Sequence, residues 1–126
     1  MSSFKTPREM FPLNSEVSVY VPGTIDRNNI IDTTDYSMSI ARKFTEMFGG
    51  ATITIGTGIY KSQKSDEFIE EKIIIVSANC TTKMLLDYLP EIYDLCHNLK
   101  EDLKQECIAL KVNGQMGFIG SEYNPK

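Results

Sequence analysis

The chain contains no tryptophan, only one histidine and only three cysteines among its 126 residues. The cysteines, Cys80, Cys96 and Cys107, are odd in number and show no paired spacing, so we expect free thiols in a reducing compartment, the cytoplasm. A metal site needs three or four convergent ligands, and His97 belongs to no metal-binding spacing. We therefore predict no metal and no other cofactor, and we expect His97 on a solvated surface.

The chain also lacks an excess of positive charge and a long apolar run. Lysine and arginine number 13 against 17 aspartate and glutamate, which leaves a net charge of −4. A nucleic-acid surface requires clustered cations, so a nucleic-acid partner is not expected. No apolar run approaches the ~20 residues of a membrane span, and the N-terminal residues lack the apolar core of a secretory signal. We expect a single domain over residues 15–120, with a loose arm before it (1–14) and a tail after it (121–126).

Two β-branched runs and the polar turn between them predict a long β-hairpin. Residues 51–61 alternate apolar with small or polar side chains, and residues 67–77 are rich in isoleucine. A turn centred on Lys64 pairs isoleucines across the strands and leaves Glu71 opposite Thr57. One face then carries six isoleucines: Ile53, Ile55, Ile59, Ile69, Ile73 and Ile75. The other face is expected to hold Tyr60, Phe68, Ile74 and Val76 around Gly56 and Gly58.

The segment before the hairpin predicts an amphipathic helix. Apolar side chains recur there at helical spacing, and Asp32 or Thr33 can cap the start. Gly49 and Gly50 end the helix, because glycine adopts the left-handed conformation without steric cost. The residues of the apolar stripe are Tyr36, Ile40, Phe44 and Met47.

The segment after the hairpin predicts a second helix, capped by Asn79 or Thr81. Its apolar stripe recurs without interruption at spacings typical of a helix. Pro90 lies inside the stripe and predicts a kink or a break into two shorter helices. The residues of the stripe are Leu85, Leu89, Ile92, Cys96, Leu99 and Leu103.

The remaining elements complete an α+β pattern. Residues 17–21 alternate valine with other side chains and predict a short strand, and residues 107–112 predict another. Asn113 and Gly114 indicate a type I′ hairpin into residues 116–119. The order β-α-β-β-α-β, with a C-terminal hairpin extension, predicts a ferredoxin-like sandwich: a four-stranded antiparallel sheet with two helices on one face. The alternative is an α+β meander with a mixed sheet.

Four short motifs follow one another between residues 20 and 71: YVPGT at 20–24, FGGAT at 48–52, GTGIY at 56–60 and an acidic pair at 70–71. This pattern resembles a group of small uncharacterised α/β proteins of bacteria, phages and archaea, a domain of unknown function. The resemblance implies a ferredoxin-like fold and a phage or mobile-element context. It implies no activity and no functional residue.

Tyr60 and Glu71 form the candidate ligand site. A carboxylate on a largely apolar face suits acid/base chemistry. In the predicted register, however, the two side chains point to opposite faces of the hairpin, which argues against their acting together. The structural interpretation is that Glu71 accepts a hydrogen bond from Thr57 or from a loop backbone. The sequence contains no recognisable catalytic signature, so no catalytic residue is predicted.

The sheet face away from the helices is predicted to be apolar, whereas a solvated antiparallel face should be polar. A large exposed apolar patch marks an interaction surface, and glycines on it allow another surface to approach closely. We therefore expect a homodimer or a protein partner through this face. The predicted partner-binding residues are Tyr20, Gly56, Gly58, Tyr60, Phe68 and Ile74.

Three functions fit these features. The favoured one is a non-catalytic protein-binding module, such as a phage or mobile-element accessory protein that inhibits a host factor or a defence system. The alternative is a dimeric ferredoxin-like sensor or enzyme for a small molecule or nucleotide, with its pocket near Tyr60 and Glu71. The third is an RNA binder with Tyr20 and Phe68 as stacking aromatics, which ranks last because the RNA-recognition signature is missing and the charge is negative.

Overall fold

The computed structural model describes residues 12–26, 28–61 and 65–120. Most of the predicted arm, the centre of the predicted hairpin turn and the predicted tail lie outside these residues. Five strands form one antiparallel sheet in the order β4-β5-β1-β6-β7, and a small separate hairpin pairs β2 with β3. The strands are β1 (Ser15–Pro22), β2 (Thr24–Ile25), β3 (Asn29–Ile30), β4 (Thr52–Lys61), β5 (Phe68–Cys80), β6 (Ile108–Val112) and β7 (Gln115–Ile119).

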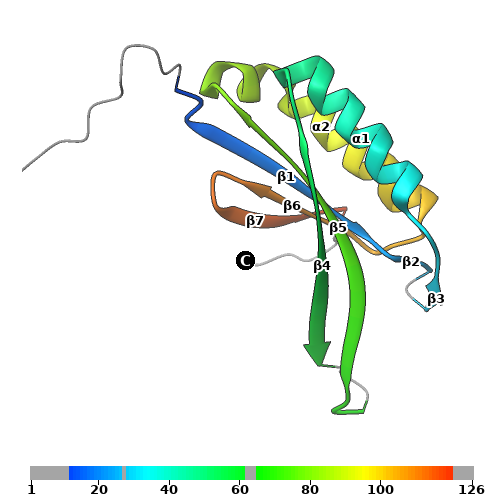
Figure 1. Cartoon of the computed structure of the whole chain (residues 1–126). Helices are drawn as coiled ribbons and strands as arrows, with labels where there is room; N and C mark the ends of the chain where they lie inside the picture. The colour runs from blue at the N-terminus through cyan, green and yellow to red at the C-terminus, as the bar shows by residue number, and fades with distance from the viewer. Residues whose placement is uncertain (1–11, 27, 62–64, 121–126) are drawn as a thin grey trace, which may run out of the picture.

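Two helices, α1 (Thr34–Phe48) and α2 (Thr82–Asp102), cover one face of the sheet (Figure 1). The α+β class, the two helices and the antiparallel sheet confirm the coarse prediction, and the arrangement is consistent with a ferredoxin-like fold. The strand count differs, because β7 joins the sheet at the edge beside β6 and makes five strands instead of four. Within the described residues, neither helix is long and apolar enough to cross a membrane.

The helix ends follow local signals in the sequence. Asp32 accepts hydrogen bonds from the backbone and the hydroxyl of Thr34, the first residue of α1, and these bonds hold the pKa of its carboxyl below the ordinary value. The helix ends at Gly49, whose φ of 95° is the left-handed conformation expected there. The side chain of Thr81 accepts from the backbone of Met84 at the start of α2. This helix continues through Pro90 instead of breaking into two.

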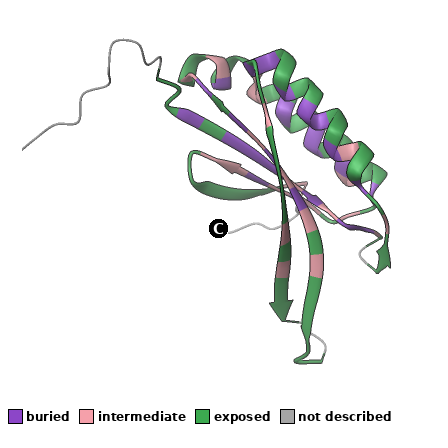
Figure 2. Cartoon of the chain, in the orientation of Figure 1, coloured by how far each residue is buried: buried purple, intermediate pink, exposed green. Residues whose placement is uncertain are grey.

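The core lies between the helices and the sheet. Both predicted helical stripes point into it, except that Tyr36 and Leu89 are half-buried at its rim. Figure 2 shows the buried residues concentrated on the inner sides of the helices and along β1. The sheet contributes Val17, Val19, Val21, Ile74, Val76, Ala78, Ile108 and Leu110.

The register of the β4–β5 hairpin differs from the prediction by one residue. Ile55 pairs with Ile74 rather than Ile73, and Gly58 rather than Thr57 pairs with Glu71. Pairing of β5 with β1 on its other side explains the difference, because Val19 lies opposite Val76 and both are fully buried. The six isoleucines are therefore divided between the two faces. Ile53, Ile55 and Ile59 share the helix side with Ile74 and Val76, and Ile69, Ile73 and Ile75 share the other side with Tyr60.

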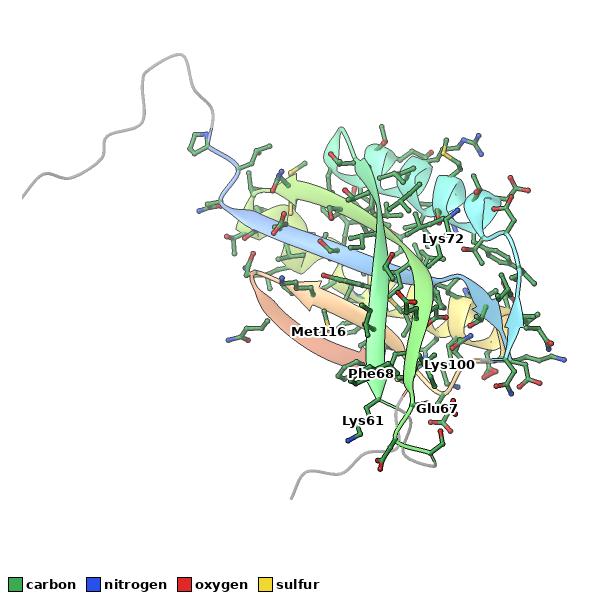
Figure 3. The ribbon with its side chains drawn as sticks, turned by 60° about the horizontal axis from the view of Figure 1, so that its bottom comes forward. Lys61, Glu67, Phe68, Lys72, Lys100 and Met116 are labelled. Carbon is green, nitrogen blue, oxygen red and sulfur yellow. The ribbon has the colours of Figure 1, made fainter. Side chains whose placement is uncertain are left out.

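The far end of this hairpin extends beyond the rest of the sheet (Figure 1). β1 pairs with β5 only from residue 73 onward, whereas β4 pairs with β5 as far as Phe68. Residues 57–61 and 68–72 thus form a two-stranded extension, here called the ribbon. Lys61, Glu67 and Phe68 lie at its free end (Figure 3).

Candidate functional site

Tyr60 and Glu71 lie on the same side of the sheet, the side turned away from the helices, here called the open face. Glu71 pairs with Gly58, and Tyr60 pairs with Ile69, two positions along each strand. Since side chains alternate between faces, Tyr60 is the diagonal cross-strand neighbour of Glu71, and diagonal neighbours lie within reach of long side chains. The prediction that they point to opposite faces was wrong, because it rested on the shifted register.

The short strand β2, which follows β1, holds the Glu71 carboxylate in place. The hydroxyl of Thr24 donates to Oε2 of Glu71 at 2.7 Å. Thr24 is buried and Glu71 is half-buried, so this hydrogen bond is partly shielded from water. The prediction that Glu71 accepts a hydrogen bond is confirmed, but the donor is the hydroxyl of Thr24 and not that of Thr57.

Thr24 is itself tied to the end of α2. The side-chain amide Nε2 of Gln105 donates to the carbonyl of Thr24 at 3.0 Å and to its hydroxyl at 3.4 Å. The backbone of Asp26 donates to the carbonyl of Leu103 at 2.8 Å. The carboxylate of Glu71 is therefore linked through two hydrogen bonds to the segment that joins α2 to β6.

A close backbone approach makes this arrangement possible. A side-chain carbon added at Gly23 would lie 2.6 Å from the carbonyl oxygen of Lys72, the residue after Glu71. Only glycine fits at that position. Sequence reasoning did not identify Thr24 or Gln105 as site residues, although Gly23 and Thr24 belong to the YVPGT motif that was singled out.

The open face beside Glu71 is apolar. Tyr20 and Ile75 pair across β1 and β5, and Ile73 lies next to them; all three are half-buried. Farther along the sheet, Met116 and Phe118 of β7 are on the same side and are exposed. The site therefore combines one anchored carboxylate, a neighbouring tyrosine and an apolar floor.

The six predicted partner-binding residues do not share one face. Tyr20, Gly56, Gly58 and Tyr60 lie on the open face, as expected. Ile74 points toward the helices and is 4% exposed, so it is unavailable to a partner. Phe68 is exposed at the end of the ribbon, on the side opposite to Tyr20. Tyr20 and Phe68 therefore cannot form the common stacking surface that RNA binding would require.

The two glycines of the GTGIY motif also differ from each other. A side-chain carbon at Gly56 would have nothing within 4 Å, so the surface is open there. At Gly58 it would lie 2.5 Å from Cδ1 of Ile73. The space above Gly58 is filled by this chain's own isoleucine, and only Gly56 leaves room for an incoming group.

The described residues hold no group of three or more potential metal ligands. His97 is exposed on α2, as predicted. Cys80, Cys96 and Cys107 are free thiols. Burial raises the pKa of Cys96 to about 12 and also raises the pKa values of Cys80 and Cys107. Little thiolate forms at neutral pH under such conditions, which makes these thiols poor nucleophiles.

Two grooves lie on the helical side of the molecule, away from Glu71. One, of about 430 Å³, runs between α1 and α2 and is lined mainly by polar and charged side chains. The other, of about 560 Å³, lies between α1 and the edge strand β4 and is largely apolar. Neither contains a residue of the Tyr60–Glu71 site.

Comparison with known proteins identifies similar folds. No protein-family model matches the chain, and no curated protein sequence matches it. The chain is similar in structure to a phage SAM lyase solved in complex with S-methyl-5′-thioadenosine, with a TM-score of 0.64. It is also similar to a phage SAM lyase in the apo state, with a TM-score of 0.62. In both comparisons the sequences are 16% identical, and the match covers 94% of this chain and 99% of the other.

These matches correct two sequence-based predictions. The chain was expected to be a non-catalytic protein-binding module, and more generally not an enzyme. Both similar structures are those of an enzyme, matched over almost their whole length, so the comparisons contradict that reading and support the small-molecule alternative. The resemblance to a domain of unknown function stays a prediction.

Proposed function

We propose that this protein is a lyase of ferredoxin-like fold that acts on S-adenosylmethionine in the cytoplasm and releases S-methyl-5′-thioadenosine. The observation that carries the proposal is the match, over nearly the full length of both chains, to the phage SAM lyase solved with that thioether. The match also supports the phage or mobile-element setting inferred from the sequence motifs. At 16% identity the match concerns the fold, so the chemistry has to come from this chain's own residues.

The Tyr60–Glu71 site suits a sulfonium ligand. S-adenosylmethionine carries a positive charge on sulfur, flanked by an adenosyl group and a four-carbon amino-acid chain. The Glu71 carboxylate attracts that charge, and Tyr60 offers an aromatic face, which cations also favour. The apolar side chains of Tyr20 and Ile73 provide a floor for the aromatic part of the ligand.

Release of the thioether breaks the bond between the sulfonium sulfur and the adjacent carbon of the amino-acid chain. The electron pair of that bond moves to sulfur, which becomes neutral. A carboxylate that only paired with the cation would stabilise the substrate more than the transition state, because the charge disappears during the reaction. We therefore assign Glu71 a second role, that of accepting the proton that leaves the neighbouring carbon when the fragment departs as an alkene. The hydrogen bond from Thr24 orients the carboxylate for this step.

The test is incubation of the purified chain with S-adenosylmethionine, with chromatographic detection of S-methyl-5′-thioadenosine and mass analysis of the four-carbon product. We expect the thioether and an unsaturated amino acid. Glu71→Gln should lower kcat much more than it raises KM, whereas Asp94→Asn, an exposed change on α2, should leave both unchanged.

Several outcomes would contradict the proposal. Absence of thioether formation, together with absence of S-adenosylmethionine binding by calorimetry, would reject the lyase. A cyclic lactone as the four-carbon product would keep the lyase and reject the proton-accepting role of Glu71, because the substrate's own carboxylate would then displace the sulfur. A rise in KM alone in Glu71→Gln would limit Glu71 to binding the cation.

A further inference from the structure

The side-chain amide of Gln105 is surrounded by hydrogen-bond acceptors. Gln105 is half-buried in the segment between α2 and β6. Its Nε2 lies 3.0 Å from the carbonyl oxygen of Thr24, 3.3 Å from that of Leu103 and 3.4 Å from the hydroxyl of Thr24. Carbonyl oxygens only accept hydrogen bonds, so the nitrogen of the amide and not its oxygen must face them. These contacts therefore fix the orientation of the amide group.

The Thr24 hydroxyl lies between the Gln105 amide and the Glu71 carboxylate. It has one proton and two lone pairs, and it rotates to suit its partners. Nε2 of Gln105 donates to its oxygen, and Oε2 of Glu71 lies 2.7 Å from the same oxygen. Since a carboxylate only accepts, the proton of Thr24 points to Glu71. The three groups form a chain of hydrogen bonds that runs in one direction, from Gln105 through Thr24 to Glu71, and each bond polarises the next.

The backbone on both sides of this contact adopts a conformation that is unfavourable for residues other than glycine. Lys104, directly before Gln105, has a φ of 52°. Asp26, two positions after Thr24, has a φ of 55° and donates its backbone N–H to the carbonyl of Leu103 at 2.8 Å. Such left-handed residues persist where the surrounding structure holds them, and they are frequent at functional sites. The contact between Gln105 and Thr24 is therefore a fixed part of the fold.

We propose that Gln105 is a positioning residue for Glu71 in the proposed lyase. The amide holds Thr24 by its carbonyl and its hydroxyl, and it thereby keeps the Thr24 proton directed at Oε2 of Glu71. Oε1 is then the oxygen that faces the substrate and accepts the proton from carbon. Gln105 touches neither the substrate nor the reacting atoms and acts through Thr24 alone. This role rests on the proposed function, because it concerns the proton-accepting step assigned to Glu71.

Steady-state kinetics on S-adenosylmethionine test this role. Gln105→Met removes both N–H donors and keeps nearly the same side-chain length, so the direction of the Thr24 proton is no longer fixed. We expect kcat to fall about ten- to a hundredfold with little change in KM, because attraction of the cation needs only the charge of Glu71. Gln115→Met is the matched control, since Gln115 is exposed at the start of β7, and it should leave both constants unchanged.

A second substitution and a double variant distinguish positioning from a general loss of structure. Gln105→Glu keeps the shape of the side chain but places an oxygen where the nitrogen was, and this carboxylate competes with Glu71 for the Thr24 proton. Its kcat should fall at least as far as that of Gln105→Met. In a Thr24→Val background no proton is left to direct, so Gln105→Met should lower kcat there by no more than about twofold. A purely structural effect of Gln105 would instead multiply with that of Thr24→Val.

Urea unfolding gives a readout that does not depend on catalysis. The losses of Gln105→Met and Thr24→Val should not add in the double variant, because both disrupt one chain of hydrogen bonds. Gln105→Asn, which draws the amide back by one carbon, replaces Gln105→Met if that variant does not fold, with the same expected fall in kcat.

The outcomes separate this role from the lyase itself. A wild-type kcat in Gln105→Met would overturn the proposal, as would a rise in KM alone or independent effects of Gln105→Met and Thr24→Val. A wild-type chain that forms no thioether would reject the lyase and this role with it. An active wild type with an equally active Gln105→Met would reject the role of Gln105 alone.

Discussion

The hydroxyl of Thr24 donates a hydrogen bond of 2.7 Å to Oε2 of Glu71, although 47 positions separate the two residues in the sequence. Thr24 is in turn held by the side-chain amide of Gln105 at 3.0 Å. The short strand β2 therefore connects the carboxylate of the candidate site to the segment that follows α2.

Replacement of Thr24 by valine removes that hydrogen bond and keeps nearly the same side-chain volume, so it measures what the hydrogen bond contributes to stability. Thr24→Val leaves a half-buried carboxylate without this donor, and we expect the free energy of unfolding in urea to fall by about 1–3 kcal/mol. Thr45→Val is the control, because the Thr45 hydroxyl donates to the Ala41 carbonyl within the same helix and not to a carboxylate. Equal losses in the two variants would show that the contact to Glu71 contributes nothing particular.

Gly23→Ala should destabilise the protein by displacing the loop from β5. The added carbon would lie 2.6 Å from the Lys72 carbonyl oxygen. The backbone has to shift to remove such a clash, and this lowers the free energy of unfolding by about 1–3 kcal/mol. Gly50→Ala is the matched control, because nothing lies within 4 Å of the carbon it adds. Thermal unfolding of both variants measures the difference, and an unchanged midpoint for Gly23→Ala would mean that the loop can move away freely.

Substitutions on the buried and on the exposed side of α2 should have different effects on stability. Ile92 is fully buried, so Ile92→Ala should lower the free energy of unfolding by about 2–5 kcal/mol. Asp94 is exposed two positions later, and Asp94→Ala should change it by about 0.5 kcal/mol or less. Denaturant titration of the two variants tests the packing, and similar losses would contradict the burial of this face.

Because of Cys96, the free energy of unfolding should decrease as the pH rises into the alkaline range. Its pKa is about 12 in the folded chain against an ordinary 9.0, so between these values the unfolded chain has lost a proton that the folded chain keeps. The resulting stabilisation is complete below pH 9 and decreases as the pH rises, by up to about 1.4 kcal/mol per pH unit. Urea titrations from pH 8 upward should show a smaller decrease for Cys96→Ala than for the wild type. Cys80 and Cys107, whose pKa values are also raised, should retain part of the dependence. Parallel pH profiles would refute the assignment.

Local sequence signals determined the positions of the helices and turns. Gly49 ends α1, Thr81 caps α2, and Asn113 and Gly114 form the predicted turn with φ angles of 50° and 83°. Each depends on a side chain or a glycine acting within a few residues of itself. The sequence also singled out Tyr60 and Glu71, because a tyrosine and a carboxylate stand out in an apolar hairpin.

Only the tertiary structure decided which residues face one another. Residues 73–76 of β5 are apolar at every position, so alternation within the hairpin does not distinguish its two faces. The choice was made by β1, whose Val17, Val19 and Val21 are fully buried and pair with Ala78, Val76 and Ile74. In the register that results, Tyr60 and Glu71 lie on the same face of the sheet. Thr24 and Gln105 joined the site through contacts across 47 and 81 positions, distances over which a pattern of neighbouring residues carries no information.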